Sequence, residues 1–483
     1  MTTNQDEWSS VSVALLKNPY DFKLWQKLVY SAESQNGLIN KNLNQVEIEN
    51  LRKSYESFLN RYPFLLRYWM SYALWERRLD HNDKAEEIFL RALRFGGYDV
   101  TLWVTYLKFK IETLTNNIGD ILKLFEAARQ NIGYNYQSFE FYLLYLEFLN
   151  TYADQTNNFR KKSIMLLRIM LEVPLYNFSA AYEKIFDFVS SKSSTIDDFS
   201  QFMHASNLAA LKKLSQNNKK VIQEQLEKVV ADAYVVNQSK SFELFGYERL
   251  LVNNELVHEA SSVSLNQIET WANYLNFVEC TYPFDYVMQL YERALLSTCN
   301  HQKIILKYVD YCVIKGKHLQ ASNILCKTMP NSDRSASVWA LLRLIDLEIA
   351  TGSVLKAKDL ISKYILANSD IPNSVFEKLM QIEAFISAND EDHLCALTHE
   401  IIAATKSPIF LEKLTKLPVS DAKQKEFFLR FVGKGNTDSY ISLAGSIELA
   451  KYAFFWTKLR ELCDDSDLEG ITFPQLSNRP HDS

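Results

Sequence analysis

The chain has 483 residues, of which 47% are hydrophobic and 23% are charged, so it holds enough apolar material for a large buried core. Its formal net charge of −5 excludes a broad electrostatic attraction for nucleic-acid phosphates. The low counts of glycine (12) and proline (10) disfavour sandwiches and low-complexity linkers and favour helices joined by short turns.

The N-terminus MTTNQDEWSS is polar and acidic, so we expect no secretory signal. No window approaches 18 uncharged apolar residues, so we expect no membrane span and no membrane partner. The six cysteines form no CxxC motif, which is typical of a reducing compartment. These observations predict a soluble intracellular protein.

An aromatic register recurs along the chain. Trp69 and Trp103 stand 34 residues apart, and in each case Tyr follows three residues later. A helix-turn-helix unit of this length cannot bury its own apolar face and must stack on its neighbours. We therefore predict an all-α protein, an α-solenoid of repeats, whose core includes Trp25, Trp69, Tyr72, Trp75, Trp103, Tyr106, Tyr142, Tyr145, Trp271, Tyr274 and Trp339.

The second unit shows the pattern best. Its second helix, KAEEIFLRALRFGG, places Ala85 and Ala92 seven residues apart on one face, where small side chains let a neighbouring helix approach. Polar stretches interrupt the register after the fifth unit. We therefore expect an N-terminal array at 1–190, a polar break at 191–221, a long helix and C-terminal array at 222–463, and a disordered tail at 464–483.

No enzyme motif has the spacing that its chemistry requires. The chain lacks a GxxxxGK[ST] phosphate loop, and neither of its His-Glu pairs is followed by the second histidine of HExxH. His393, Cys395 and His399 are a weak metal candidate, because histidines six residues apart do not share one helical face. We therefore expect no catalytic residue, no cofactor and no metal site.

Two alternatives concern binding. The Trp and Tyr stripe could stack nucleic-acid bases, but rings at 0, 3 and 6 along a helix that faces a partner helix favour packing. Four arginines, Arg77, Arg78, Arg91 and Arg94, form the most concentrated basic group of the first array. They are either a solvated face with local acidic partners or a docking site for an acidic partner or an RNA backbone.

The aromatic register, joined to the Ala-x-x-Ile-Phe-x-Arg-Ala-Leu helix, resembles the half-a-TPR (HAT) repeat. Five segments in this order are similar to the pre-mRNA-processing factor 39 and 42 family of U1 small nuclear ribonucleoprotein components, and the compact length is closer to the 42-type fungal paralogue. The segments are RYPFLLRYWMSYALWE, LWVTYLKF, MLEVPLYNF, a degenerate middle and IETWANYLNFVE.

This resemblance implies a nuclear, non-catalytic scaffold that holds U1 particle proteins together during 5′ splice-site recognition. It also implies a dimer, with itself or a paralogous HAT protein, through the C-terminal array. The apolar segments FFLRFV and YISLAGSIELAKYAFFW point the same way if they form an uncapped solenoid end. A scaffold of mRNA 3′-end cleavage or rRNA processing, and a direct RNA-binding module, remain the alternatives; RNA contact is expected to be mainly indirect.

Overall fold

The computed structural model describes residues 4–34, 44–113, 117–154, 158–191, 195, 198–202, 205–214, 218–251, 263–328, 334–387, 390–433, 449–471 and 473. These residues form helices and short 3-10 turns and contain no strand, which confirms the predicted all-α solenoid. The chain divides into two compact units, 1–304 and 305–483, and the division falls within one helix. Each unit is described by itself.

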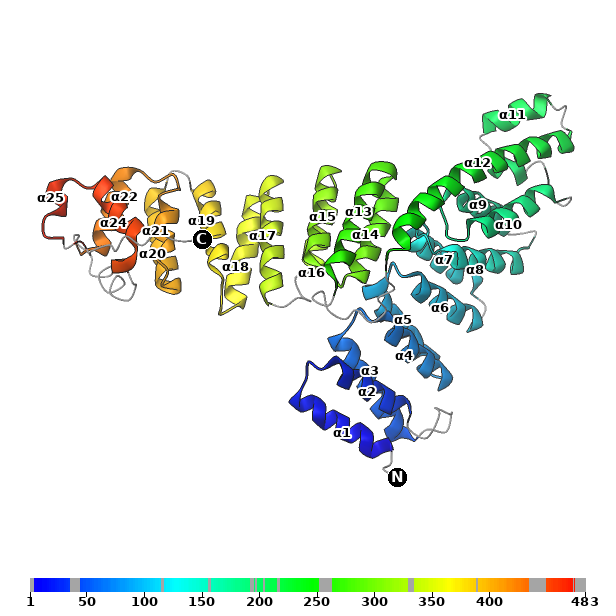
Figure 1. The fold of residues 1–483 in the computed structure, drawn as a ribbon, viewed down its shortest axis with the longest axis horizontal. Helices are drawn as coiled ribbons and strands as arrows, with labels where there is room; N and C mark the ends of the chain where they lie inside the picture. The colour runs from blue at the N-terminus through cyan, green and yellow to red at the C-terminus, as the bar shows by residue number, and fades with distance from the viewer. Residues whose placement is uncertain are drawn as a thin grey trace. The chain divides into compact units, whose positions relative to one another are not determined.

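Unit 1 is a stack of antiparallel helix pairs (Figure 1). Its helices are α1 (Asn4–Lys17), α2 (Phe22–Glu33), α3 (Gln45–Arg61), α4 (Leu66–Arg78), α5 (Asn82–Gly96), α6 (Val100–Glu112), α7 (Ile118–Ile132), α8 (Phe139–Thr151), α9 (Phe159–Glu172), α10 (Phe178–Ser190), the 3-10 turn η2 (Asp198–Gln201), α11 (Ala205–Leu214), α12 (Lys219–Glu248), α13 (Leu265–Thr281) and α14 (Phe284–Ser297).

Small residues set the close packing of the second repeat. Ala85 and Ala92 are fully buried on α5, as expected for positions that admit a neighbouring helix. At the end of α5, a side chain added to Gly96 would come within 2.3 Å of Leu66 at the start of α4. Glycine at this position therefore allows the two helices of the repeat to approach where they meet.

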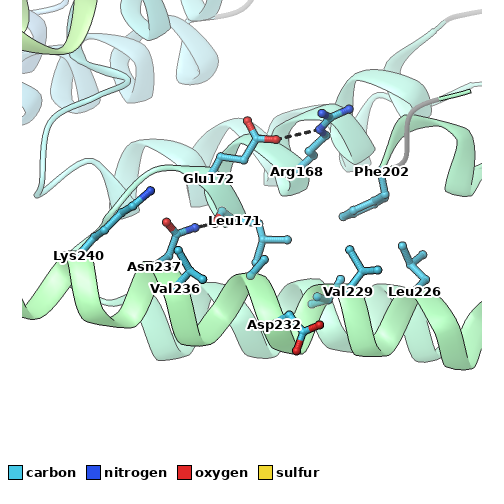
Figure 2. A pocket seen from close by; sticks show the side chains of 12 residues that line it. Arg168, Leu171, Glu172, Phe202, Leu226, Val229, Asp232, Val236, Asn237 and Lys240 are labelled. Carbon is cyan, nitrogen blue, oxygen red and sulfur yellow. Dashed lines mark hydrogen bonds and ion pairs between the residues drawn. The ribbon is translucent and has the colours of Figure 1, made fainter. Parts of the chain in front are cut away.

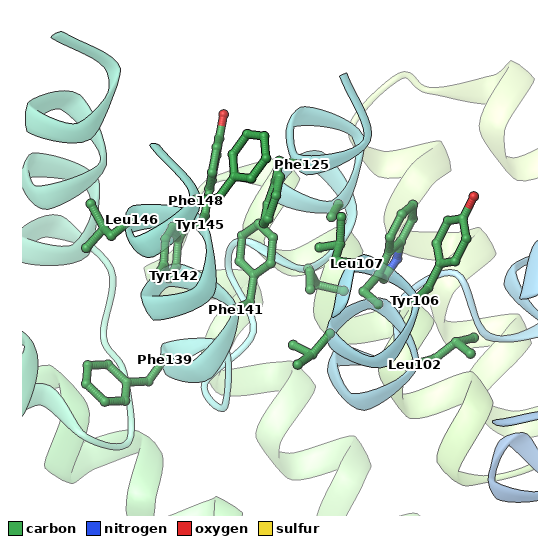
Figure 3. Close-up of a cluster of buried hydrophobic side chains, with 14 of the residues drawn as sticks. Leu102, Tyr106, Leu107, Phe125, Phe139, Phe141, Tyr142, Tyr145, Leu146 and Phe148 are labelled. Atoms are coloured by element: carbon green, nitrogen blue, oxygen red, sulfur yellow. The ribbon is translucent and has the colours of Figure 1, made fainter. Parts of the chain in front are cut away.

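Aromatic rings fill the core between successive repeats. Figure 3 shows Phe125 of α7 among Phe141, Tyr145 and Phe148 of α8. The Phe125 and Tyr145 rings are stacked, with centroids 4.5 Å apart and planes 10° apart. Phe125, Phe141 and Tyr145 are fully buried, so the stripe seen in the sequence is the packing surface of the solenoid.

The long helix α12 is fixed against α9 by hydrogen bonds to backbone carbonyls. Pro174 cannot continue α9, so carbonyl groups near the end of this helix lack helical partners. Asn237 donates from its side-chain amide to the carbonyl of Leu171, and Ser241 donates to that of Leu175 at 2.9 Å. In each pair the donor and acceptor residues are 66 apart in sequence, so the two segments run in the same direction and in a fixed register.

Helix α14 also contacts the first half of unit 1. The side-chain amide of Gln289 donates to the carbonyl of Gln130 at 2.6 Å and accepts from the backbone N–H of Tyr134 at 2.8 Å. The rings of Tyr134 and Tyr286 also lie 5.7 Å apart. The repeat formed by α13 and α14 therefore belongs to the same compact unit as the N-terminal helices.

Unit 2 is also built of helix pairs (Figure 1). Its core between α17 and α19 is aliphatic, with Leu341, Ile345, Ile361 and Ile382 buried. Its helices are α15 (Gln302–Ile314), which spans the division, α16 (His318–Thr328), α17 (Arg334–Ala350), α18 (Val354–Ala367), α19 (Asn373–Ile386), α20 (Glu391–Thr405), α21 (Ile409–Leu414), α22 (Asp421–Phe431), the 3-10 turn η5 (Leu449–Lys451), α24 (Ala453–Leu462) and α25 (Asp465–Leu468).

The apolar segments near the C-terminus pack inward. Phe427, Phe428 and Phe431 of α22 are buried in one cluster with Phe455 and Trp456 of α24. The expectation that these segments form an exposed apolar end is therefore wrong for the described part of them, because they cover one another. The remainder, 440–448, lies outside the described residues.

The expected division into arrays at 1–190 and 222–463 remains a prediction about repeat organisation. Within the expected break, the structure has η2 and α11. The single turn α25 falls in the stretch expected to be a tail, of which residues 474–483 lie outside the described residues.

Candidate interaction sites

Two repeat junctions in unit 1 share one arrangement of four side chains. In the first junction cluster, Glu56 of α3 accepts two hydrogen bonds of 2.8 Å from the guanidinium of Arg91 on α5. Tyr72 of α4 donates its hydroxyl to the same carboxylate at 3.3 Å. The guanidinium also lies over the Trp69 ring, 5.1 Å from its centroid, where the ring face attracts a cation.

The second junction cluster repeats this arrangement around α12, α13 and α14. Arg293 donates to both oxygens of Glu248 at 2.6 and 2.7 Å, and Tyr274 donates to Oε1 at 2.9 Å. The Arg293 guanidinium lies over the Trp271 ring, 5.5 Å from its centroid. Here the side chain of Glu248 is only 6% exposed, so this cluster is the more deeply buried of the two.

Two intermediate junctions keep the tyrosine and carboxylate but exchange the cation. Tyr145 donates to Glu126 at 2.6 Å, and Arg129 of the same helix supplies the charge at 3.0 Å. At the other junction, the ammonium group of Lys110 donates a hydrogen bond of 2.8 Å to Glu86. The constant feature is thus a tyrosine hydroxyl paired with a carboxylate of the preceding helix.

The clusters shift the pKa values of their members. The hydrogen bond from Arg91 lowers the pKa of Glu56. Burial works against the charge on Arg293, but the nearby charge of Glu248 outweighs it and raises the pKa of this guanidinium. Burial first, and the neighbouring carboxylates second, raise the pKa of Tyr72 well above its usual value. In the first cluster, Tyr72 therefore remains a neutral donor and Glu56 remains a charged acceptor.

The tryptophans of the register have a second role in fixing the turns. The indole N–H groups of Trp25, Trp69 and Trp103 donate to the carbonyls of Pro19, Pro63 and Gly97 at 2.9, 2.9 and 2.7 Å. Each acceptor precedes its tryptophan by six residues. The side chain thus satisfies its own polar group and fixes the turn that leads into its helix.

The predicted repeat-core residues lie largely in the interior. Trp25, Trp75 and Trp339 are half-buried. The rings of Tyr72 and Tyr274 stack on Tyr55 and Tyr247 of the preceding helices, which leaves little face for a nucleic-acid base. The buried members are Trp69, Tyr72, Trp103, Tyr106, Tyr142, Tyr145, Trp271 and Tyr274.

The arginine group is divided by its contacts. Arg91 belongs to the first junction cluster, which sequence reasoning did not detect. Arg77 pairs with Glu112, and Arg78 lies 4.5 Å from the centroid of the Trp75 ring. The recurrence of Arg-Ala-Leu at Arg91 and Arg293 is the sequence signal that could have indicated a structural role.

Neither a metal cluster nor a membrane-spanning helix occurs in the described residues. In that part of the chain, no group of three or more His, Cys, Asp or Glu side chains could hold a metal ion. Nε2 of His393 lies 3.5 Å from Glu383, while burial raises the pKa of Cys395 and lowers that of His399. Over the same residues, no helix has the length and apolarity needed to cross a membrane.

A groove lies between α9 and α12, with Phe202 at one end and Lys240 at the other (Figure 2). Its volume is about 420 Å³. Arg168 and Glu172 form an ion pair of 3.0 Å on the α9 side. We call this the α9/α12 groove; it is lined by Arg168, Leu171, Glu172, Phe202, Leu226, Val229, Val230, Asp232, Ala233, Val236, Asn237 and Lys240.

Comparison with known families matches two parts of the chain. The family described as PRP39 N-terminal HAT repeat matches residues 9–187, and that described as PRP39 C-terminal HAT repeat matches residues 246–383. The chain belongs to the PRP39 HAT-repeat family. Each match contains one complete junction cluster, so the family register and the Glu-Tyr-Arg-Trp arrangement coincide.

Similar proteins are named as a U1 component and as pre-mRNA-processing factors. U1 small nuclear ribonucleoprotein component PRP42 of Saccharomyces cerevisiae is 27% identical over 70% of this chain and 63% of its own length. Pre-mRNA-processing factor 39 of Schizosaccharomyces pombe is 25% identical over 66% of this chain and 54% of its own length. The human factor 39 is 22% identical over 74% and 54%. The chain therefore spans 54 to 63% of these relatives.

A solved structure of CstF-77 is similar with a TM-score of 0.41 and 13% identity, over 82% of this chain and 86% of that one. This likeness is too weak to support an argument.

Proposed function

We propose that the chain is a non-catalytic scaffold of the U1 small nuclear ribonucleoprotein, which acts in the nucleus and bridges particle proteins for 5′ splice-site recognition. The observation that carries this proposal is the match of both PRP39 HAT-repeat families, together with a relative named as a U1 component. A solenoid provides an extended surface for several partners, which suits this role.

The aromatic rings are engaged in packing within the chain, which supports protein binding over direct RNA binding. The tyrosines that could stack bases are stacked on other rings and bonded to carboxylates. The net charge of −5 gives no broad attraction for phosphates. Contact with RNA is therefore proposed to be mainly indirect, through particle proteins.

A dimer, with itself or with a paralogous HAT protein, is proposed through the C-terminal array. Its buried α22 and α24 segments do not supply the contact. Instead, unit 2 exposes other large apolar side chains: Leu355 is 74% exposed, Leu366 is 87% exposed and Phe385 is 70% exposed. Leu355 and Leu366 stand eleven residues apart on α18, about three helical turns, so they share one face of this helix and support an interface in this unit.

Affinity purification of the full chain followed by sequencing of bound RNA tests the proposal. We expect U1 RNA to be enriched, and to be lost when high salt strips the particle proteins from the chain. Enrichment of ribosomal RNA or of 3′-end cleavage substrates would favour another processing complex. Tight binding of naked RNA by the purified chain, falling steeply with salt, would favour direct recognition.

A further inference from the structure

Helix α12 exposes more apolar surface than its place in the repeat requires. Its residues Val229 and Val236 are 44% and 55% exposed, and they lie seven residues apart, which places them on one face. Met165 of the neighbouring α9 is 49% exposed. A surface helix normally places polar side chains on the faces that do not meet the core, so these aliphatic side chains call for a partner.

The α9/α12 groove is long enough for the apolar side chains of a short helix to insert into it. From Leu226 to Lys240 it follows α12 for 15 residues, which is about 20 Å at 1.5 Å per residue, or roughly four helical turns. Its floor consists of the buried side chains of Leu171, Leu226 and Val230. An amphipathic helix inserts apolar side chains at i, i+3 or i+4 and i+7 into a groove of this kind.

The chemistry of the groove disfavours a small polar ligand. Such ligands require a few convergent polar groups that fix their orientation. The amide of Asn237 already donates to the carbonyl of Leu171, and Arg168 is paired with Glu172. In Figure 2 the carboxylate of Asp232 points away from α9. The aliphatic wall therefore remains the main binding element.

Charge distinguishes one end of the groove from the other. Lys240 is exposed at that end and has no ion pair within the described part of the chain, whereas Phe202 and Leu226 close the opposite end. We infer that the groove binds an amphipathic helix of a U1 particle protein, with its apolar face against Val229 and Val236 and a carboxylate at Lys240. This inference rests on the proposed function.

The test uses the full chain and purified U1 particle proteins. Val229→Asp and Val236→Asp place a charge on the apolar wall, and Lys240→Glu reverses the charge at the end. The matched controls on the same helix are Val221→Asp and Lys228→Glu, which lie outside the groove. We expect each groove variant to weaken binding at least tenfold and each control to leave it unchanged, with melting temperatures equal to that of the unaltered chain.

A photo-crosslinking residue at position 236 identifies the occupant. A crosslink to a partner segment that is helical and carries a carboxylate near Lys240 supports the inference. A crosslink to RNA, to a second copy of this chain or to a non-helical segment overturns it, as does equal binding by groove variants and controls. If the unaltered chain recovers neither U1 RNA nor particle proteins, the proposed function fails as well, which separates the two failures.

Discussion

The two units hold their repeats together with different chemistry. Unit 1 buries tyrosine, tryptophan, carboxylate and guanidinium groups in joint clusters, as at Glu248 and Arg293. Unit 2 packs aliphatic side chains between α17 and α19, and its buried acids Glu348 and Glu383 pair with the ammonium groups of Lys356 and Lys358 instead of a guanidinium. Since directional hydrogen bonds fix a register more strictly than aliphatic contacts, unit 1 specifies its helix positions more tightly.

Alkaline pH should destabilise unit 1 more than unit 2, and we expect this to be the largest difference in unfolding free energy between the units. Burial raises the pKa of Tyr98 and Tyr282 to about 12, and those of Tyr106 and Tyr274 further. A raised pKa means that the fold favours the neutral phenol. Its stabilising contribution is complete below about pH 10, where the unfolded phenol titrates, and is lost as pH rises through the folded value.

Among the residues that the structure describes, ten buried tyrosines lie in unit 1 and two in unit 2: Tyr55, Tyr62, Tyr72, Tyr106, Tyr136, Tyr142, Tyr145, Tyr274, Tyr286 and Tyr291 against Tyr308 and Tyr311. Each unit by which burial raises a tyrosine pKa corresponds to about 1.4 kcal/mol, and the raised values of Tyr55, Tyr72, Tyr106 and Tyr145 act together, so we expect a larger effect than from a single substitution. We expect circular dichroism to show two steps, with most tyrosinate absorbance appearing in the first. A single step, or tyrosinate that appears mainly in the second, would contradict the comparison.

The buried and exposed arginine pairs give the next largest contrast. Arg293→Met leaves the carboxylate of Glu248 buried without a cation, and we expect a loss of about 3 to 5 kcal/mol in the free energy of unfolding. Arg343→Met in unit 2 removes a pair whose side chains are 41% and 52% exposed, so a loss of about 0 to 1 kcal/mol is expected.

Urea denaturation followed by circular dichroism measures both arginine variants. The double variant Glu248→Gln/Arg293→Met should recover part of the loss, because it removes the uncompensated charge while Tyr274 keeps an acceptor. Equal losses for Arg293→Met and Arg343→Met would show that the buried cluster is not what distinguishes the units.

The sequence predicted the solenoid, because a helical periodicity recurs at the repeat interval. It could not predict which side chains meet across repeats. Glu56 and Arg91 are 35 residues apart, and Asn237 and Leu171 are 66 apart, so their contact depends on how helices stack. The α9/α12 groove escaped detection for the same reason, since its two walls are distant in sequence.

Replacing one tryptophan in each unit should give a smaller difference between the units than the arginine pairs give. Trp69 is 2% exposed and donates its indole N–H to Pro63, so Trp69→Ala should cost about 3 to 5 kcal/mol. Trp339 of unit 2 is half-buried, and Trp339→Ala should cost roughly half as much because less apolar area leaves water on folding. Thermal melting of the two variants checks the order, and a reversed order would contradict it.

The arginine group gives the smallest effect on stability and separates a structural role from a docking role. Arg91→Gln removes the paired hydrogen bonds to Glu56 and the contact with Trp69, which should cost about 1 kcal/mol because both charged groups are partly exposed. Replacing Arg77, Arg78 and Arg94 together with Gln should change the free energy of unfolding by no more than about 0.5 kcal/mol, as for other surface changes.

Binding by the triple variant at Arg77, Arg78 and Arg94 then decides the docking role, since its fold is expected to be intact. If these arginines dock the first array on an acidic partner, a pull-down should recover less of that partner with the triple variant and the normal amount with Arg91→Gln. Reduced recovery with Arg91→Gln and normal recovery with the triple variant would mean that the first junction cluster positions the docking surface. Normal recovery with both variants would leave the group as a solvated face, because its remaining contacts, such as that of Arg78 with Trp75, are then local ones within the repeat.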